Sequence, residues 1–152
     1  MKHMIQKGLF ASALVLLSST GFAGSKNVII NANVVGVCEF STGDAATIDF
    51  GPLRAGDPVT PASTTVGFWC SKDTAYTLTT SDGSNAEGSQ KNLVLGADKI
   101  PYALVLDKSN GTGLGKGTPI DVTLTATIAN SALDDVPAGT GYTDTVVLTL
   151  TP

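Results

Sequence analysis

"TPIDVTLTATIAN", residues 118–130, decides the fold class of this chain. Apolar side chains occupy every second position from Ile120 to Ile128, and aspartate or threonine fills the positions between them. This period of two is that of a β-strand with one buried face, whereas a helix repeats every 3.6 residues. Threonine and valine, which are both stiff at χ1, suit a pleated surface. The stretch therefore predicts a β-strand.

The same period recurs along the chain. "STTVGFWC", residues 63–70, places Val66, Phe68 and Cys70 on one side. Turns rich in glycine and proline separate the runs, and no window carries a helical stripe. We therefore expect an all-β protein whose seven or eight short strands form an immunoglobulin-like sandwich of two sheets, with a closed barrel as the alternative. The other strand-like runs are 46–51, 75–81, 92–96, 102–107 and 145–151.

The first residues have the three-part layout of a secretory signal peptide. A basic head, "MKHMIQK", precedes an apolar run at 8–17 and the small residues of "SSTGFA". The apolar run is shorter than the roughly 20 residues that a membrane helix needs. We expect a signal peptide at 1–23, cleaved after Ala23, and an exported mature chain with no membrane span.

Cleavage changes the charge of the chain and removes its only histidine. The mature chain keeps 7 basic residues against 13 acidic ones, a net charge of −6, which argues against nucleic acid and anionic membranes as partners. His3 leaves with the signal peptide, so a serine or cysteine nucleophile has no histidine base. A mechanism that uses carboxylates alone, such as glycoside hydrolysis, remains formally open. We expect no enzyme, no catalytic residues and no cofactor.

Two short motifs have ordinary structural interpretations. "NGTGLGKGT", residues 110–118, has glycines reminiscent of a phosphate loop, but the glycine spacing is wrong and no helix follows, so we interpret it as a flexible connection between strands. Asp82, Asn85 and Glu87 lie close together, but their spacing differs from that of an EF-hand loop and is typical of a hairpin turn. We therefore expect no metal site.

Cys38 and Cys70 are the only cysteines of the chain. In an exported protein an even pair predicts a disulfide, and two thiols without histidine are too few ligands for zinc. Bridging them closes a loop of 33 residues, which on the chain-entropy model stabilises the fold by roughly 3.5 to 4 kcal/mol.

The two ends of the mature chain complement each other. Val28, Ile30, Ala32 and Val34 share one face of a strand-like run that precedes Cys38. At the other end, the sequence stops after a run that an immunoglobulin-type sandwich would pair with one further strand. We expect this run to leave open an apolar groove, which is an aggregation hazard. Either the N-terminal run folds back into its own sheet, or it completes the sheet of a neighbouring molecule. The residues expected to face the groove are Val146, Leu148 and Leu150.

The order of several motifs resembles the spore coat protein U family, which includes subunits of archaic chaperone–usher pili. The resemblance covers residues 34–151 and depends on Cys38, "IDFG" at 48–51, Cys70 with the "Y-x-L" that follows it, Asp82-Gly83, and the closing "VPAGTGYTDTV" at 136–146. It implies an incomplete immunoglobulin-like fold. A periplasmic chaperone would supply the missing strand, and an outer-membrane usher would exchange it for the N-terminus of the next pilus subunit.

Carried onto this sequence, the resemblance implies a signal peptide at 1–23, a donor strand at 24–33 and a pilin domain at 34–152. The donor residues would be Val28, Ile30, Ala32 and Val34, and the disulfide would join Cys38 to Cys70. The product would be a surface fimbrium that serves attachment and biofilm formation. A self-contained secreted binding domain and a spore or cyst coat component are the alternatives.

Overall fold

The computed structural model describes residues 21, 23–41, 43 and 45–152. The predicted signal peptide, except for Gly21 and Ala23, lies outside these residues. The chain divides into two units, residues 1–33 and residues 34–152. In the described part of the first unit no residue belongs to a strand, and Val28 and Ile30 are 80% and 89% exposed. Among the described residues, no helix has the length and apolar character needed to cross a membrane.

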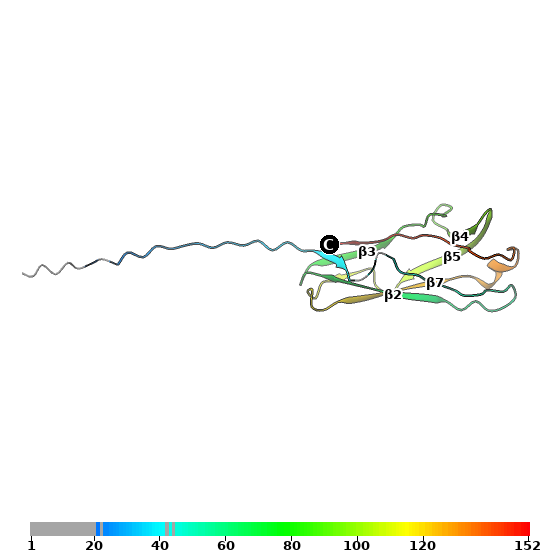
Figure 1. Cartoon of the computed structure of the whole chain (residues 1–152), viewed down its shortest axis with the longest axis horizontal. Coiled ribbons are helices and arrows are strands. Elements are labelled where there is room, and N and C mark those ends of the chain that lie inside the picture. The colour runs from blue at the N-terminus through cyan, green and yellow to red at the C-terminus, as the bar shows by residue number, and fades with distance from the viewer. Residues whose placement is uncertain (1–20, 22, 42, 44) are drawn as a thin grey trace, which may run out of the picture. The chain divides into compact units, whose positions relative to one another are not determined.

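The second unit, which we call the body, is an all-β sandwich of two antiparallel sheets (Figure 1). A single 3-10 turn, η1 (Asn130–Leu133), interrupts the β-structure after β7. The predicted sandwich is thus confirmed, and the sheets do not form a closed barrel. One sheet has the order β1 (Cys38–Phe40), β2 (Ala62–Cys70), β7 (Ile120–Thr127), β5 (Asp98–Leu106), β4 (Lys91–Leu95), and the other has the order β6 (Asn110–Thr112), β3 (Ala75–Thr80), β8 (Leu148–Thr151).

The centre of the core lies where the two sheets meet over β2 and β7. These strands pair from Ala62↔Ala126 to Phe68↔Ile120, and their alternate side chains point inward as the sequence predicts. Phe68 and Val122 are fully buried. The Phe68 ring packs edge-on against Tyr76 of the opposite sheet, with ring centroids 4.9 Å apart. Burying such side chains is the main source of stability in a domain of this size.

The predicted disulfide between Cys38 and Cys70 is present. The two cysteines are direct partners in the register of β1 and β2, and Cys70 is fully buried. The backbone continues this pairing beyond β1, because the Ser71 N–H donates to the Val37 carbonyl at 2.8 Å. The cross-link therefore fastens the short first strand, which has few residues of its own to hold it.

Three sequence predictions about individual runs are wrong. Residues 46–51 form no strand, and the run predicted at 145–151 is a strand only from Leu148 onward. Conversely, residues 110–112, predicted to be a flexible connection, form β6 against β3. Gly111 permits this pairing, because a Cβ there would lie 2.6 Å from the Tyr76 hydroxyl oxygen. In each case the availability of a partner, more than the local pattern, decides whether a strand forms.

Candidate functional site

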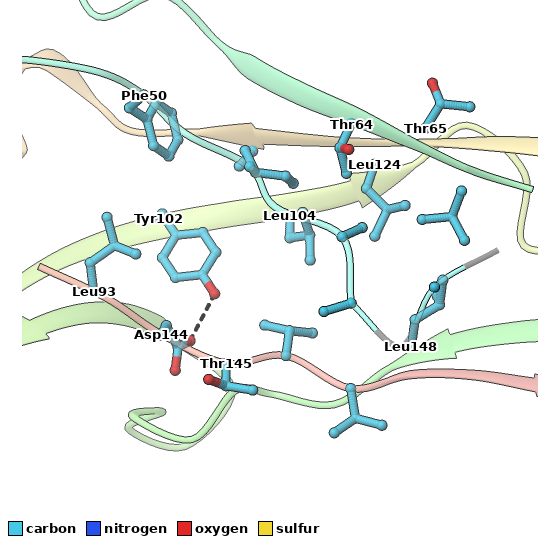
Figure 2. A pocket seen from close by; sticks show the side chains of 18 of the residues that line it. Phe50, Thr64, Thr65, Leu93, Tyr102, Leu104, Leu124, Asp144, Thr145 and Leu148 are labelled. Atoms are coloured by element: carbon cyan, nitrogen blue, oxygen red, sulfur yellow. Dashed lines mark hydrogen bonds between the residues drawn. The ribbon is translucent and has the colours of Figure 1, made fainter. Parts of the chain in front are cut away.

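A groove of about 740 Å³ opens between the two sheets of the body (Figure 2). Leu104 of β5 and Leu124 of β7 point into it from one layer, and Leu148 points into it from the other. Two stretches without strand structure form its walls, residues 45–50 on one side and residues 144–147 on the other. The interior is mostly aliphatic and aromatic, and its further lining includes Phe40, Ile48, Phe50, Val66, Ala126 and Val146.

The C-terminal wall is hydrogen-bonded along one edge. The Ser84 N–H donates to the Thr145 carbonyl at 3.0 Å, and the Ser81 N–H donates to the Val147 carbonyl at 2.9 Å. Consecutive residues of an extended chain direct their backbone groups to opposite edges, so the groups of Val146 face away from residues 81–84. Val146 makes no backbone hydrogen bond to any residue that the structure describes. β8, which continues this wall, is likewise the edge strand of its sheet.

The opposite wall is equally open. Residues 45–50 belong to no strand, and within the described chain none of them joins a backbone–backbone hydrogen bond. Ile48 and Phe50 are half-buried and pack against the core clusters, which keeps this stretch in place. The groove therefore has an apolar interior with a row of unpaired backbone donors and acceptors on each side, the arrangement that accepts an extended peptide as an added strand.

One end of the groove is polar. The Tyr102 hydroxyl of β5 donates to Asp144 Oδ2 at 2.7 Å, and the backbone N–H of Asn85 donates to Asp144 Oδ1 at 3.0 Å. Figure 2 shows the Tyr102 side chain reaching from β5 to Asp144 on the C-terminal wall. Burial and the bond to the Asp144 carboxylate both raise the pKa of the Tyr102 phenol. This contact, which we call the Tyr102–Asp144 bridge, joins the five-stranded sheet to the C-terminal wall at that end.

Of the residues predicted to face the groove, Val146 and Leu148 line it. Leu150 does not line it, although it packs against the buried cluster around Phe68 as Leu148 does. The residues predicted as a donor strand, Val28, Ile30 and Ala32, belong to the first unit and have no strand partner in the described chain. Val34, the fourth predicted donor residue, lies at the start of the body and is 94% exposed.

Sequence reasoning missed the second wall and the polar end. The pattern of "ATIDFG", residues 46–51, predicts an ordinary strand, whereas in the structure its alternate apolar residues Ile48 and Phe50 line the groove. Asp144 lies between threonines in "YTDTV", and nothing in this sequence context indicates that Tyr102, 42 positions earlier, donates a hydrogen bond to it. Among the described residues, no three histidine, cysteine, aspartate or glutamate side chains gather as a metal ion would require.

Comparison with known proteins relates the whole arrangement to one family. The family model of the Spore Coat Protein U domain matches residues 25–149, which include the exposed N-terminal segment as well as the body. Among solved structures, the chain is similar to one in the crystal structure of the CsuC–CsuE chaperone–tip adhesion subunit pre-assembly complex from the archaic chaperone–usher Csu pili of Acinetobacter baumannii, with 25% identity and a TM-score of 0.51. The similarity covers 77% of this chain but only 40% of that one. No curated protein matches the chain.

Proposed function

Because this chain belongs to the Spore Coat Protein U domain family, we propose that it is a structural subunit of a chaperone–usher pilus, and that it polymerises when the N-terminal segment of one copy enters the groove of the next. The observation that carries this proposal is the groove, whose two walls present unpaired backbone on either side of an apolar interior. The exposed residues Val28 and Ile30 supply the matching apolar face.

The energetics of such an addition are favourable. Burying each valine or isoleucine side chain of the donor contributes about 1.5 to 3 kcal/mol. Each main-chain hydrogen bond along the groove walls adds roughly 0.5 to 1.5 kcal/mol. The donor segment and the acceptor groove are different surfaces of the same chain, so the contact is head-to-tail and generates a filament. Polymerisation without covalent chemistry is thus the activity, and the protein is not an enzyme.

An open groove also calls for protection before assembly. An exposed apolar cleft between unpaired edges is an aggregation site. The solved structure to which this chain is similar holds a pilus subunit together with its chaperone. For this chain we infer three successive steps. A periplasmic chaperone first occupies the groove, an outer-membrane usher exchanges it for the next subunit's N-terminus, and the growing fimbrium reaches the cell surface, where it serves attachment and biofilm formation.

Deleting residues 25–33 from the exported chain tests this function. The truncated subunit keeps its groove, so it should still be recovered with the chaperone, but it has nothing to donate and should form no fibres. Unboiled samples on a denaturing gel should show a ladder of oligomers for the full chain and a single band for the truncated one. Fibres assembled from the truncated subunit alone would show that another contact drives polymerisation.

A further inference from the structure

We propose that the Tyr102–Asp144 bridge fixes the register in which the donor segment enters the groove. In this register Ala32 faces Asp144, Ile30 faces Val146 and Val28 faces Leu148. This inference rests on the proposed function, and it assigns a positioning role to two residues that the function itself does not require.

The C-terminal wall offers three groove-facing positions. Residues 144–148 all line the groove, and among them Asp144, Val146 and Leu148 are the half-buried, alternate ones. Leu150, the next residue of the series, packs like Leu148 against the cluster around Phe68, but it does not belong to the lining. A donor strand therefore finds room for three consecutive side chains of one face. The N-terminal segment has four apolar candidates on that face, so one of them must remain outside.

The direction of the donor follows from the sandwich itself. In an immunoglobulin-type fold the last strand runs antiparallel to the strand beside it. A donor that completes this sheet runs antiparallel to residues 144–151, so its later residues lie at the Asp144 end. The donor residue that faces the bridge is then Ile30, Ala32 or Val34, depending on the register.

The bridge decides among these three. The Tyr102 side chain extends from β5 to Asp144, so its ring and the carboxylate that it bonds occupy this end of the groove (Figure 2). A small donor side chain is therefore accommodated there with the least overpacking. Ala32 is the smallest residue on the donor face. With Val34 at the bridge, Val28 would face Leu150, where the groove has no position.

The remaining register is disfavoured by charge. With Ile30 at the bridge, the Lys26 side chain would face Leu148 and enter the apolar part of the groove. Burying an unpaired ammonium group there is strongly unfavourable. In the proposed register Lys26 falls opposite Leu150, beyond the lining, where its ammonium group stays in solvent.

Cysteine pairs in assembled fibres test the register. Directly opposite residues on paired strands have Cβ atoms about 4.5 to 5.5 Å apart, whereas residues shifted by two lie about 7 to 8 Å apart. A disulfide needs about 3.5 to 4.5 Å, so a small local shift lets a directly opposite pair close it and a shifted pair stays out of reach. Full-length chains that carry Ile30→Cys with Val146→Cys, or Val28→Cys with Leu148→Cys, should form cross-linked ladders under mild oxidation. Two pairs that are shifted by two residues, one in each direction, should not cross-link, and neither alters the bridge: Ile30→Cys with Leu148→Cys, and Val28→Cys with Val146→Cys.

Cross-linking of a shifted pair, or fibres in which neither predicted pair cross-links, would overturn this register and leave the pilus function intact. Absence of fibres from the unmodified chain in the presence of its chaperone and usher would instead overturn the proposed function.

Donor size provides a second measurement that needs no added cysteine. Ala32→Leu should lower the rate of fibre formation by about tenfold or more. The larger side chain would overpack against the Tyr102 ring and weaken the binding of the donor segment to the groove by that factor. Val34→Leu, which lies outside the groove in this register, is the matched control and should change the rate by less than about twofold. A larger effect at Val34 than at Ala32 would place Val34 at the bridge and contradict the inference.

Discussion

Strands β2 and β7 and the two walls of the groove differ in what pairs with them. In β2 and β7 the inward-pointing residues are apolar except for Thr64, each strand has a neighbour on both sides, and Phe68 and Val122 are fully buried. In the walls Ile48, Phe50 and Val146 also line the groove, yet residues 45–50 and 144–147 belong to no strand and these three side chains are only half-buried. The difference teaches that strand pairing is complete in one half of this body, whereas the other half has a groove with unpaired backbone, which the proposed function fills with a donor strand.

The largest effect on fibre formation is expected at the proposed contact between the groove and the donor segment. Ile30→Asp places a carboxylate on the apolar face of the donor, and burying that charge in the groove is prohibitively costly. Fibre formation should be lost, while the folded body stays unchanged because residue 30 lies in a separate unit. Electron microscopy and unboiled gels of secreted material measure the loss.

Ile29→Asp is the matched control for this change, because residue 29 points to the opposite face of an extended segment. It carries the same charge and is as exposed in the structure, at 81% compared with 89% for Ile30. Equal loss of fibres in both variants would show that the charge of the segment, and not its buried face, matters.

The completed half should show the next largest effect. Phe68→Ala removes a fully buried ring and should lower the free energy of unfolding by about 3 to 5 kcal/mol, both in the chaperone-bound subunit and in the fibre. Ile48→Ala, in the groove wall, should cost clearly more in the fibre than before assembly, because only the donor strand completes its surroundings. Denaturant titrations of both states would distinguish the two sites, and a cost at Ile48 that is the same in each would contradict the comparison.

A smaller effect on the free energy of unfolding is expected at the Tyr102–Asp144 bridge. Tyr102→Phe removes one hydrogen bond to a charged group and should cost about 1 to 3 kcal/mol near neutral pH. The folded state raises the pKa of the Tyr102 phenol above its ordinary value of about 10, so this stabilisation is complete below that pH and is lost as the unfolded phenol ionises above it. The difference in unfolding free energy between the unmodified chain and the variant should therefore shrink above pH 10, and a difference that stays constant would mean that the bridge does not form.

The outer face of the sheet should be nearly neutral. Val105 lies on β5 with its side chain 61% exposed, away from both the core and the groove. Val105→Thr should change stability by less than about 0.5 kcal/mol and leave fibre formation unaffected. Loss of fibres in this variant would point to a second assembly surface on the five-stranded sheet.

The sequence predicts the strands of the core well, but it predicts the structure around the groove only in part. Alternation predicts β2, β3, β4, β5 and β7, and the export signal with an even cysteine pair predicts the disulfide. The same alternation at 46–51 predicts a strand that does not form, because no strand of the described chain lies beside these residues to form hydrogen bonds with their backbone. Tyr102 and Asp144 could not be paired from the sequence, since nothing in a linear pattern reports contacts between sheets.

Amide hydrogen exchange in assembled fibres, read by mass spectrometry of peptides, tests the central claim most directly. If each subunit completes its neighbour, the amides of residues 27–33 and those of residues 144–148 should both be strongly protected in the fibre, and both should exchange rapidly once fibres are dissociated into single subunits. Fibres in which residues 27–33 exchange as freely as an unfolded peptide would contradict the account.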